Sequence, residues 1–359
     1  MTSESSAQTA AQHAATSSES SAEPADQSAR LLVAVDAMGG DHGPSVVVEG
    51  AHIAAENGTP VLLVGDPDVL ADMSDLPIAP ATEVVEMGAD PAKAVRRMKD
   101  SSIVRAAEAV RDGRASSVIS AGNTGAAMAA SLLRMGRIKG VARPAIAVPF
   151  PVLDSTPSTL LDCGANADCQ PEWLVQFARL GTAYARQRFD LERPRVAILT
   201  IGEEAGKGNT LVKAACELLE DGGWAAECQA DYVGNVEGGD LMSGVADVIV
   251  CDGFTGNVAL KGLEGGFEIF RNAIRSAIDS APELHAAADK IDNVIDPLFQ
   301  IFNAGNTGAA MLLGTRGVTM IAHGSSPAIT IANAIRTADE MAACGVVDSL
   351  RAAVGRDPE

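Results

Sequence analysis

From residue 31 onward, the chain alternates short, uninterrupted apolar runs with longer stretches of helical character. Most of the apolar runs lack the in–out alternation of a half-exposed strand, which is typical of strands that are covered on both faces. We therefore predict strands at residues 31–35, 61–64, 118–119, 145–148, 159–161, 196–201, 247–250 and 318–321.

Helical stretches separate these runs, at residues 44–56, 91–111, 171–188, 210–220 and 326–344. A repeated strand-then-helix order predicts a mainly parallel sheet with helices on both faces. The fold class that we expect is therefore α/β, a three-layer Rossmann-like sandwich, interrupted by a long helical insert at about residues 256–302.

The two ends of the chain differ from this pattern. Residues 1–29 contain no Lys or Arg and are rich in Ser, Ala and Gln, which indicates a disordered tail rather than a targeting peptide. We expect a single α/β domain over residues 30–350 and a C-terminal tail at 351–359. Scattered cysteines and the lack of a membrane-spanning apolar run favour a cytoplasmic location.

Charge and motif searches exclude several classes of protein. A formal net charge of −20 argues against nucleic acid as a partner, because such binding depends on Lys and Arg that neutralise phosphates. The chain has no Gly-x-Gly-x-x-Gly fingerprint, no Cys-x-x-Cys pair and no His-Glu-x-x-His helix. We therefore expect no metal and no cofactor.

The second half of the insert carries apolar residues at helical spacing, over about residues 282–302. Such a stripe indicates either a buried contact, in the core or at a homodimer interface, or a segment that lies on a membrane surface. Its polar face holds Asp289, Asp292 and Asp296 beside Lys290, which disfavours attraction to anionic lipid.

In sheets of this class, ligands bind beyond the carboxyl ends of the strands. Six loops follow predicted strands, and all are rich in Gly, Asn, Asp and Ser, which let a backbone approach a ligand closely. They are residues 36–43, 120–125, 162–166, 202–209, 252–257 and 323–326. We expect these loops to form the functional site at one end of the sheet.

The loop at 120–125 has the pattern of an anion site. A strand that ends at Ser120 and restarts as a helix would leave the backbone N–H groups of Gly122, Asn123, Thr124 and Gly125 without partners. No cationic side chain lies in this turn. A positive charge must therefore come from another part of the fold.

Three groups outside that turn could act on an anion. Lys207 lies between two glycines and just before a helix-capping Asn209, although a solvated loop lysine fits the same pattern. Arg96 belongs to the densest basic cluster, which is either a second anion contact or an exposed helix face. His42 is either a general base or a histidine that caps its loop.

Several of these segments together resemble the bacterial phosphate acyltransferase family. The similarity runs from about residue 31 to 344 and is carried by residues 33–41, 94–97, 120–125, 136–140, 161–166, 207–209, 234–237, 255–257 and 323–326. Members transfer a long acyl chain from acyl carrier protein to inorganic phosphate, and the acyl phosphate product is used for phospholipid (phosphatidic acid) synthesis. The alternatives are a short-chain phosphotransacetylase that uses acetyl-CoA and a non-catalytic scaffold for acyl carrier protein or membrane.

The chemistry of this reaction suits the residues. Phosphate is already an anionic nucleophile at neutral pH, so the enzyme has to position it and to stabilise the oxyanion of the tetrahedral intermediate. We expect Lys207 to bind phosphate and Asn257 to donate to the oxyanion, with Asp36 and His42 handling protons or shaping the site. The remaining substrate-binding residues would be Gly122, Asn123, Thr124, Gly125, Asp41, Asn166, Asn209, Thr255 and Arg96.

The resemblance also implies partners. Acyl carrier protein is acidic, so it needs a local basic patch on this acidic chain, and Arg134, Arg137, Lys139 and Arg143 cluster in one segment. We expect a homodimer, and a peripheral membrane contact would run through about residues 282–302.

Overall fold

Short strands form one sheet in the computed structural model, which describes residues 30–281, 290, 291 and 309–354. Within those ranges the strand order is β3-β2-β1-β4-β11-β10-β5-β6-β9-β7-β8. The strands are β1 (Leu32–Asp36), β2 (Val61–Gly65), β3 (Ile78–Pro80), β4 (Ala115–Ser120), β5 (Ala145–Phe150), β6 (Ser158–Leu161), β7 (Arg195–Leu199), β8 (Asp231–Val236), β9 (Val248–Val250), β10 (Ala310–Leu313) and β11 (Val318–Ile321).

All eight predicted strands are present, and three further strands were not predicted. Two of these, β3 and β8, lie at the edges of the sheet, where a strand needs no continuous apolar run. β8 is indeed only partly buried and contains Gly234 and Asn235. The third, β10, lies in the middle of the sheet and follows directly after the insert.

The polarity of the sheet changes at its centre. β10 is antiparallel to both β11 and β5, and β5 is antiparallel to β6, whereas the other neighbouring pairs described are parallel. The sheet is mainly parallel, as predicted. However, β6, β9, β7 and β8 run in the opposite sense to β1, β4 and β11, so the six loops do not all follow strands of one polarity.

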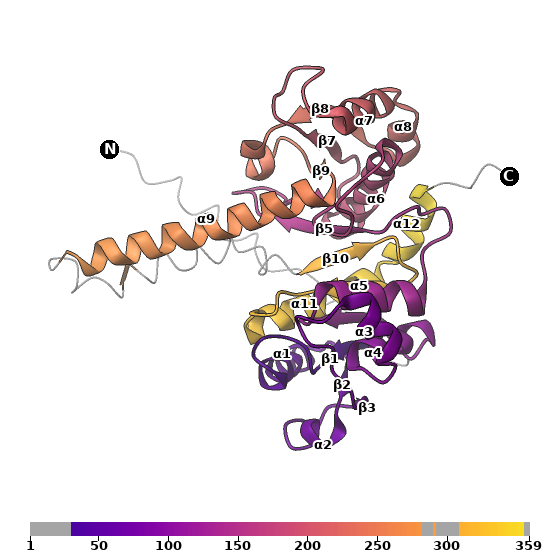
Figure 1. Cartoon of the computed structure of the whole chain (residues 1–359), viewed down its shortest axis with the longest axis vertical. Coiled ribbons are helices and arrows are strands. Elements are labelled where there is room, and N and C mark those ends of the chain that lie inside the picture. Colours follow the sequence, from indigo (N-terminus) through magenta and orange to yellow (C-terminus); the bar gives the residue numbers. More distant parts are fainter. Residues whose placement is uncertain (1–29, 282–289, 292–308, 355–359) are drawn as a thin grey trace, which may run out of the picture. The chain divides into compact units, whose positions relative to one another are not determined.

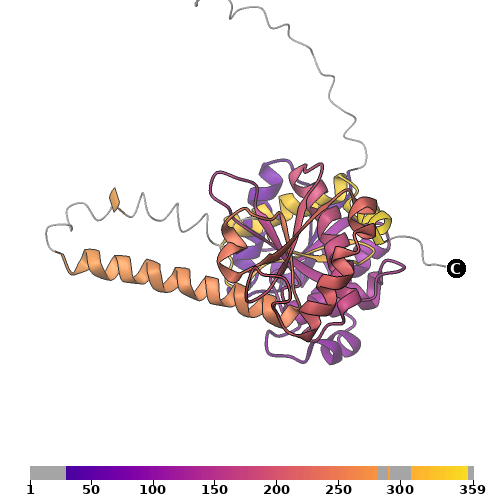
Figure 2. The ribbon, with the colours of Figure 1, turned by 90° about the horizontal axis from the view of Figure 1, so that it is seen from above.

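Twist counteracts this reversal. Each step between neighbouring strands rotates the strand direction by about 20–25°. Six steps separate β4 from β7, which gives a rotation of roughly 120–150°. The carboxyl end of β7 is therefore turned back toward the side at which β4 ends. Figure 2 shows the strands fanning out when the sheet is seen from above.

Helices cover both faces of the sheet, which confirms the three-layer prediction (Figure 1). One face packs against α1 (Pro44–Glu56), α6 (Pro171–Phe189), α7 (Thr210–Glu220), α8 (Gly223–Cys228), α11 (Ala328–Ala343) and α12 (Val346–Val354). The other packs against α3 (Pro91–Arg97), α4 (Ser102–Arg111), α5 (Thr124–Ala130), the π-helical turn η1 (Ser131–Met135), the 3₁₀ turn η2 (Gly238–Met242) and the start of α9 (Gly253–Asp279). A short helix, α2 (Pro67–Leu70), follows β2.

The residues of β1 show how each strand supplies both layers. Val33 and Val35 face the α1 side, while Ala34 faces the α4 side, and all three are buried. This pattern is why the strand reads as a continuous apolar run in the sequence.

Two predictions about helices differ from the structure. Residues 91–111 form two helices, α3 and α4, and not one. Helix α12 continues past residue 350, where we expected the tail.

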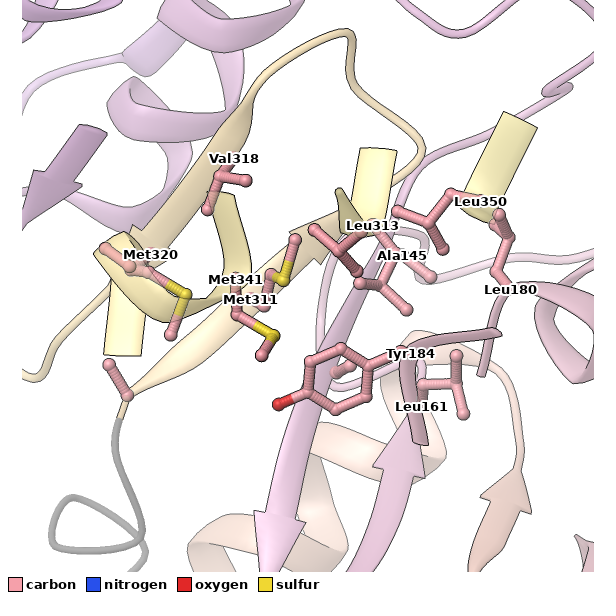
Figure 3. Close-up of a cluster of buried hydrophobic side chains, with 14 of the residues drawn as sticks. Ala145, Leu161, Leu180, Tyr184, Met311, Leu313, Val318, Met320, Met341 and Leu350 are labelled. Atoms are coloured by element: carbon pink, nitrogen blue, oxygen red, sulfur yellow. The ribbon is translucent and has the colours of Figure 1, made fainter. Parts of the chain in front are cut away.

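The core is continuous across the antiparallel centre of the sheet. Tyr184 of α6 is fully buried and lies among Ala145, Leu161, Met311 and neighbouring apolar side chains (Figure 3). These contacts bring residues of β5, β6 and β10 into one cluster. The two parallel halves of the sheet are therefore parts of the same packed unit.

The insert begins with α9, which starts beside β9 and extends away from the other described elements (Figures 1 and 2). The apolar stripe predicted at 282–302 lies outside the described residues, apart from Lys290 and Ile291. Among the helices that are described, none is long and apolar enough to span a membrane.

Candidate active site

The loops after β1 and β4 meet at a buried carboxyl group. Ser120 Oγ donates a hydrogen bond to Asp36 Oδ2 at 2.6 Å, and Gly122 N–H donates to Ser120 Oγ at 3.0 Å. A Cβ atom on Gly39 would lie only 2.8 Å from Gly122 N, so the two loops approach more closely than a side chain would allow. Gly122 N–H, which we expected to have no partner, is therefore engaged. Asp36 thus holds the predicted anion-binding turn in place through Ser120.

Asp36 lines a small cavity. Its side chain is only 3% exposed, and Oδ1 has no hydrogen-bond partner among the described residues. The cavity has a volume of about 10 Å³, roughly the room that one water molecule needs. Burial raises the pKa of Asp36, and hydrogen bonds from Ser102, Ser120 and Met38 act against that rise.

The loop after β11 joins the same group. Asp41 N–H donates to Gly324 O at 2.9 Å, and a Cβ on Gly324 would lie 2.8 Å from Asp41 Oδ2. Asp41 and His42 are both exposed. The loops after β1, β4 and β11, which are neighbouring strands, therefore come together as predicted for this part of the sheet.

The start of α5 uses the Asn123 side chain for its own structure. Asn123 Oδ1 accepts from Ala126 N–H at 3.0 Å, as an N-cap does, and Nδ2 donates to Met87 O at 2.7 Å and to Ala89 O at 3.3 Å. Because both ends of the carboxamide are engaged, this side chain anchors the turn. Thr124, the next residue, is exposed.

Asp162, in the loop after β6, organises a second part of the site. Its Oδ1 accepts from Ile146 N at 2.9 Å and Ala165 N at 3.0 Å, and its Oδ2 accepts from Asn166 N at 2.7 Å and Asn166 Nδ2 at 2.8 Å. The residue is fully buried. Burial raises its pKa, and these N–H donors act against the rise.

The first turn of α9 rests on this loop. Asp252 caps the helix by accepting from Thr255 N–H and from Thr255 Oγ1, both at 2.8 Å. Gly256 has no room for a side chain, because a Cβ there would lie 2.0 Å from Asp162 O. Asn257 is exposed, and its side chain faces Gly164, whose Cβ position is 3.6 Å away. Asn257 thus projects from a rigidly seated helix end.

Lys207 lies in the loop after β7. Its Nζ is 3.7 Å from Glu204 Oε2, and its side chain is 50% exposed. Asn209 caps α7 by accepting from Val212 N–H at 2.9 Å. Asn235 Nδ2, from β8, donates to Glu204 O at 3.0 Å and so fixes the loop.

The four basic residues predicted to bind a partner differ in their contacts, and Lys139 is exposed. Arg134 pairs with Glu108 at 3.7 Å, and Arg137 donates to the carbonyl groups of Val141 and Ala142. The Arg143 guanidinium stacks over Trp173, 4.9 Å from the ring centre. A cavity of about 410 Å³ is lined by Arg137, Arg143, Trp173, Leu132, Ala142 and Pro144. Arg96 is exposed at the end of α3.

Sequence reasoning missed Ser120 and Asp162 as functional positions, although both lie in loops that it selected. No sequence signal tells which polar residue of such a loop turns inward. Asn166, Asn209 and Thr255 were predicted to bind substrate, but their side chains form loop and capping hydrogen bonds.

Known proteins are similar to this chain in sequence and in fold. The family described as "Fatty acid synthesis protein" matches residues 31–349. A phosphate acyltransferase from Desulforudis audaxviator is 42% identical over 330 residues, covering 90% of this chain and 96% of that protein. One from Leptospira biflexa is 41% identical over 336 residues, covering 90% and 97%.

Solved structures of related fold have low sequence identity. A phosphotransacetylase from Streptococcus pyogenes has a TM-score of 0.59 at 16% identity, covering 87% of this chain and 94% of that one. A branched-chain phosphotransacylase from Enterococcus faecalis V583 has a TM-score of 0.55 at 13% identity, covering 87% and 99%. These matches show the fold, and the sequence matches show the family. The chain belongs to the fatty acid synthesis protein family, together with these phosphate acyltransferases.

Proposed function

We propose that this protein transfers a long-chain acyl group from acyl carrier protein to inorganic phosphate and so supplies acyl phosphate for phospholipid synthesis. The observation that carries the proposal is the identity of 42% to a phosphate acyltransferase over 90% of the chain. Three segments that carried the resemblance in the sequence, residues 36–41, 120–125 and 161–166, lie in loops that the fold fixes by hydrogen bonds of Asp36, Ser120 and Asp162.

In this proposal the phosphate lies against the backbone N–H groups of residues 123–125, beside Gly122, and Lys207 neutralises its charge. The twist of the sheet supports a site shared between the loops after β4 and β7, because it turns the two strand ends toward the same side. Phosphate attacks the thioester carbonyl, an oxyanion forms, and the C–S bond then breaks. No covalent enzyme intermediate is required.

Asn257 is the oxyanion donor in this scheme. Its exposed carboxamide and the seating of the helix turn against Asp162 support that role, because a donor fixed in advance needs little reorganisation. In this scheme Asp36 and Asn166 hold the loops of the site in place, and the exposed Asp41 and His42 lie on its solvent-facing side. Asn209 and Thr255 act by holding the loops that carry Lys207 and Asn257. Arg96 is a more distant contact for the anionic substrate.

The acyl carrier protein docks, in our proposal, on the basic segment that contains Arg134, Arg137, Lys139 and Arg143. The cavity beside Arg137 and Arg143 supports this assignment, since its lining contains no acidic side chain. Charge reversal at Arg143 should raise the KM for the carrier and leave the KM for phosphate unchanged. An unchanged carrier KM would remove the docking role.

We also propose a cytoplasmic homodimer that contacts the membrane peripherally. Exposed apolar side chains on α9, namely Phe254, Val258, Ile269 and Phe270, support an interface along this helix. The membrane contact is assigned to about residues 282–302, which lie mostly outside the described residues. Light scattering and co-sedimentation with vesicles test the two assignments separately.

Hydroxylamine trapping tests the proposed reaction. Acyl phosphates react with hydroxylamine to give a hydroxamate, so the purified protein should form acyl hydroxamate only when both phosphate and a long-chain acyl-carrier thioester are present. Hydroxamate formation that is independent of phosphate, or its absence with every acyl donor, would contradict the proposal.

A further inference from the structure

Lys261 of α9 and His323 of the loop after β11 face each other. Lys261 Nζ lies 3.4 Å from His323 Nε2, although the two residues are 62 positions apart in the chain. The contact brings the third turn of α9 to the loops at the carboxyl ends of β11 and its neighbours. Two basic groups thus meet at one point of a protein whose net charge is −20.

The surroundings of His323 connect this pair to the anion-binding loops. The next residue, Gly324, accepts a hydrogen bond from Asp41 N–H at 2.9 Å. The same loop approaches Gly40, whose Cβ position is 3.3 Å from Gly324 O and 3.6 Å from Ala121 Cβ. His323 therefore belongs to the loop cluster that includes residues 121–125.

The position of Lys261 on its helix connects the pair to Asn257. The two residues are four positions apart, so they lie on the same face of α9, about 6 Å apart along the axis. One helix face thus carries the proposed oxyanion donor and a lysine that reaches the loop cluster. Lys207 and Lys261 each pair with a nearby glutamate, Glu204 at 3.7 Å and Glu264 at 2.7 Å.

Hydrogen bonding defines the roles of the two side chains. Ser325 N–H donates to His323 Nδ1 at 3.3 Å, and Ser325 Oγ lies 2.8 Å from the same nitrogen. Nδ1 is therefore the acceptor, and the imidazole proton lies on Nε2, which faces Lys261 Nζ. Glu264 Oε2 accepts from Lys261 Nζ at 2.7 Å and orients it. Lys261 has three N–H donors and Glu264 takes one, so the pair presents further donors to an anion.

We propose that Lys261 and His323 bind the inorganic phosphate that attacks the thioester, an inference that rests on the proposed function. Lys261 Nζ and His323 Nε2 both donate to oxygens of hydrogen phosphate. As the P–O–C bond forms and the C–S bond breaks, the proton of hydrogen phosphate passes to the departing thiolate, which leaves as the thiol. Atoms and charge balance without a further reactant.

Steady-state kinetics with Lys261→Met tests the proposal. A lost charge-assisted hydrogen bond of about 1.5–3 kcal/mol corresponds to a rise of roughly 10- to 150-fold in the KM for phosphate. The KM for the acyl donor should stay within about twofold, because that substrate does not contact Lys261. Lys261→Arg should restore most of the phosphate affinity, and His323→Phe should raise the KM for phosphate as well. Lys213→Met, at an exposed lysine of α7, is the matched control.

A phosphate KM that is unchanged in both Lys261→Met and His323→Phe, with wild-type activity intact, would overturn the inference. Equal rises in both KM values would do the same, because they would indicate a general disturbance of the site. If Lys261→Met does not fold, Lys261→Arg and His323→Gln provide the comparison. If the wild-type protein forms no acyl phosphate, the proposed function fails instead, and calorimetric titration of inorganic phosphate into wild type and Lys261→Met still tests the binding site.

Discussion

Replacing Asp162 by Asn would disturb the network on which the first turn of α9 rests. Each carboxylate oxygen accepts two N–H groups, from Ile146 and Ala165 at Oδ1 and from Asn166, through its backbone and side chain, at Oδ2. An amide has only one acceptor oxygen, so its NH₂ group would face two N–H donors in either orientation. Two donors would therefore lose their acceptor, and the amide can direct its NH₂ group toward the partly buried donors of Asn166.

The magnitude follows from those two donors. An unsatisfied buried donor costs about 1–3 kcal/mol, and Asn166 Nδ2 keeps Pro144 O as an acceptor, so Asp162→Asn should lower the free energy of unfolding by roughly 1–3 kcal/mol, against a typical total of about 5–15 kcal/mol. Urea denaturation followed by circular dichroism measures this directly. Asp168→Asn, at an exposed position in the same loop, should change stability by less than about 0.5 kcal/mol. If Asp162→Asn matched that control, the assignment of Asp162 as the organiser of the loop would be wrong.

Three further predictions concern neighbouring parts of the site. Gly256→Ala should displace the start of α9 and abolish activity, because its Cβ would lie 2.0 Å from Asp162 O. In the control Gly238→Ala the new Cβ meets no atom within 4 Å, so activity and thermal unfolding should hardly change. Asp36→Asn should alter the pH dependence of stability, because burial raises the pKa of Asp36 in the folded protein. The wild-type protein should therefore lose stability as the pH rises from about 4 through that raised pKa. The variant should lack this loss in urea titrations at several pH values. Parallel curves for the two proteins would refute this. Asn257→Ala should fold normally but lose about 100- to 1,000-fold in turnover in the hydroxamate assay, and wild-type rates would remove its role as oxyanion donor.

The sequence predicted the buried strands well because their residues face helices on both sides. Val33, Ala34 and Val35 illustrate this, since consecutive apolar residues serve opposite layers. An edge strand such as β8 carries no such signal, as two of its six residues are exposed and three are only partly buried. The reversal at β10 was also invisible, because strand direction depends on how the chain returns to the sheet and not on the composition of the strand.

For the site, the sequence indicated the right loops but not the roles within them. Asn123 and Asn166 have the residue types of ligand contacts, yet their carboxamides hold backbone groups of neighbouring loops. Whether an Asn in a loop faces a ligand or caps its own chain depends on tertiary contacts. Lys261 was overlooked for the related reason that only the fold brings α9 to His323.

The most direct test of the proposed function is a comparison of acyl donors with the wild-type protein. Phosphate-dependent hydroxamate formation is measured with palmitoyl-acyl carrier protein and with acetyl-CoA, and kcat/KM is compared. We expect the long-chain carrier thioester to be preferred by orders of magnitude. A preference for acetyl-CoA would identify a short-chain phosphotransacetylase, and binding of the carrier without product from any donor would identify a scaffold; either result would contradict long-chain acyl transfer to phosphate as the function of this protein.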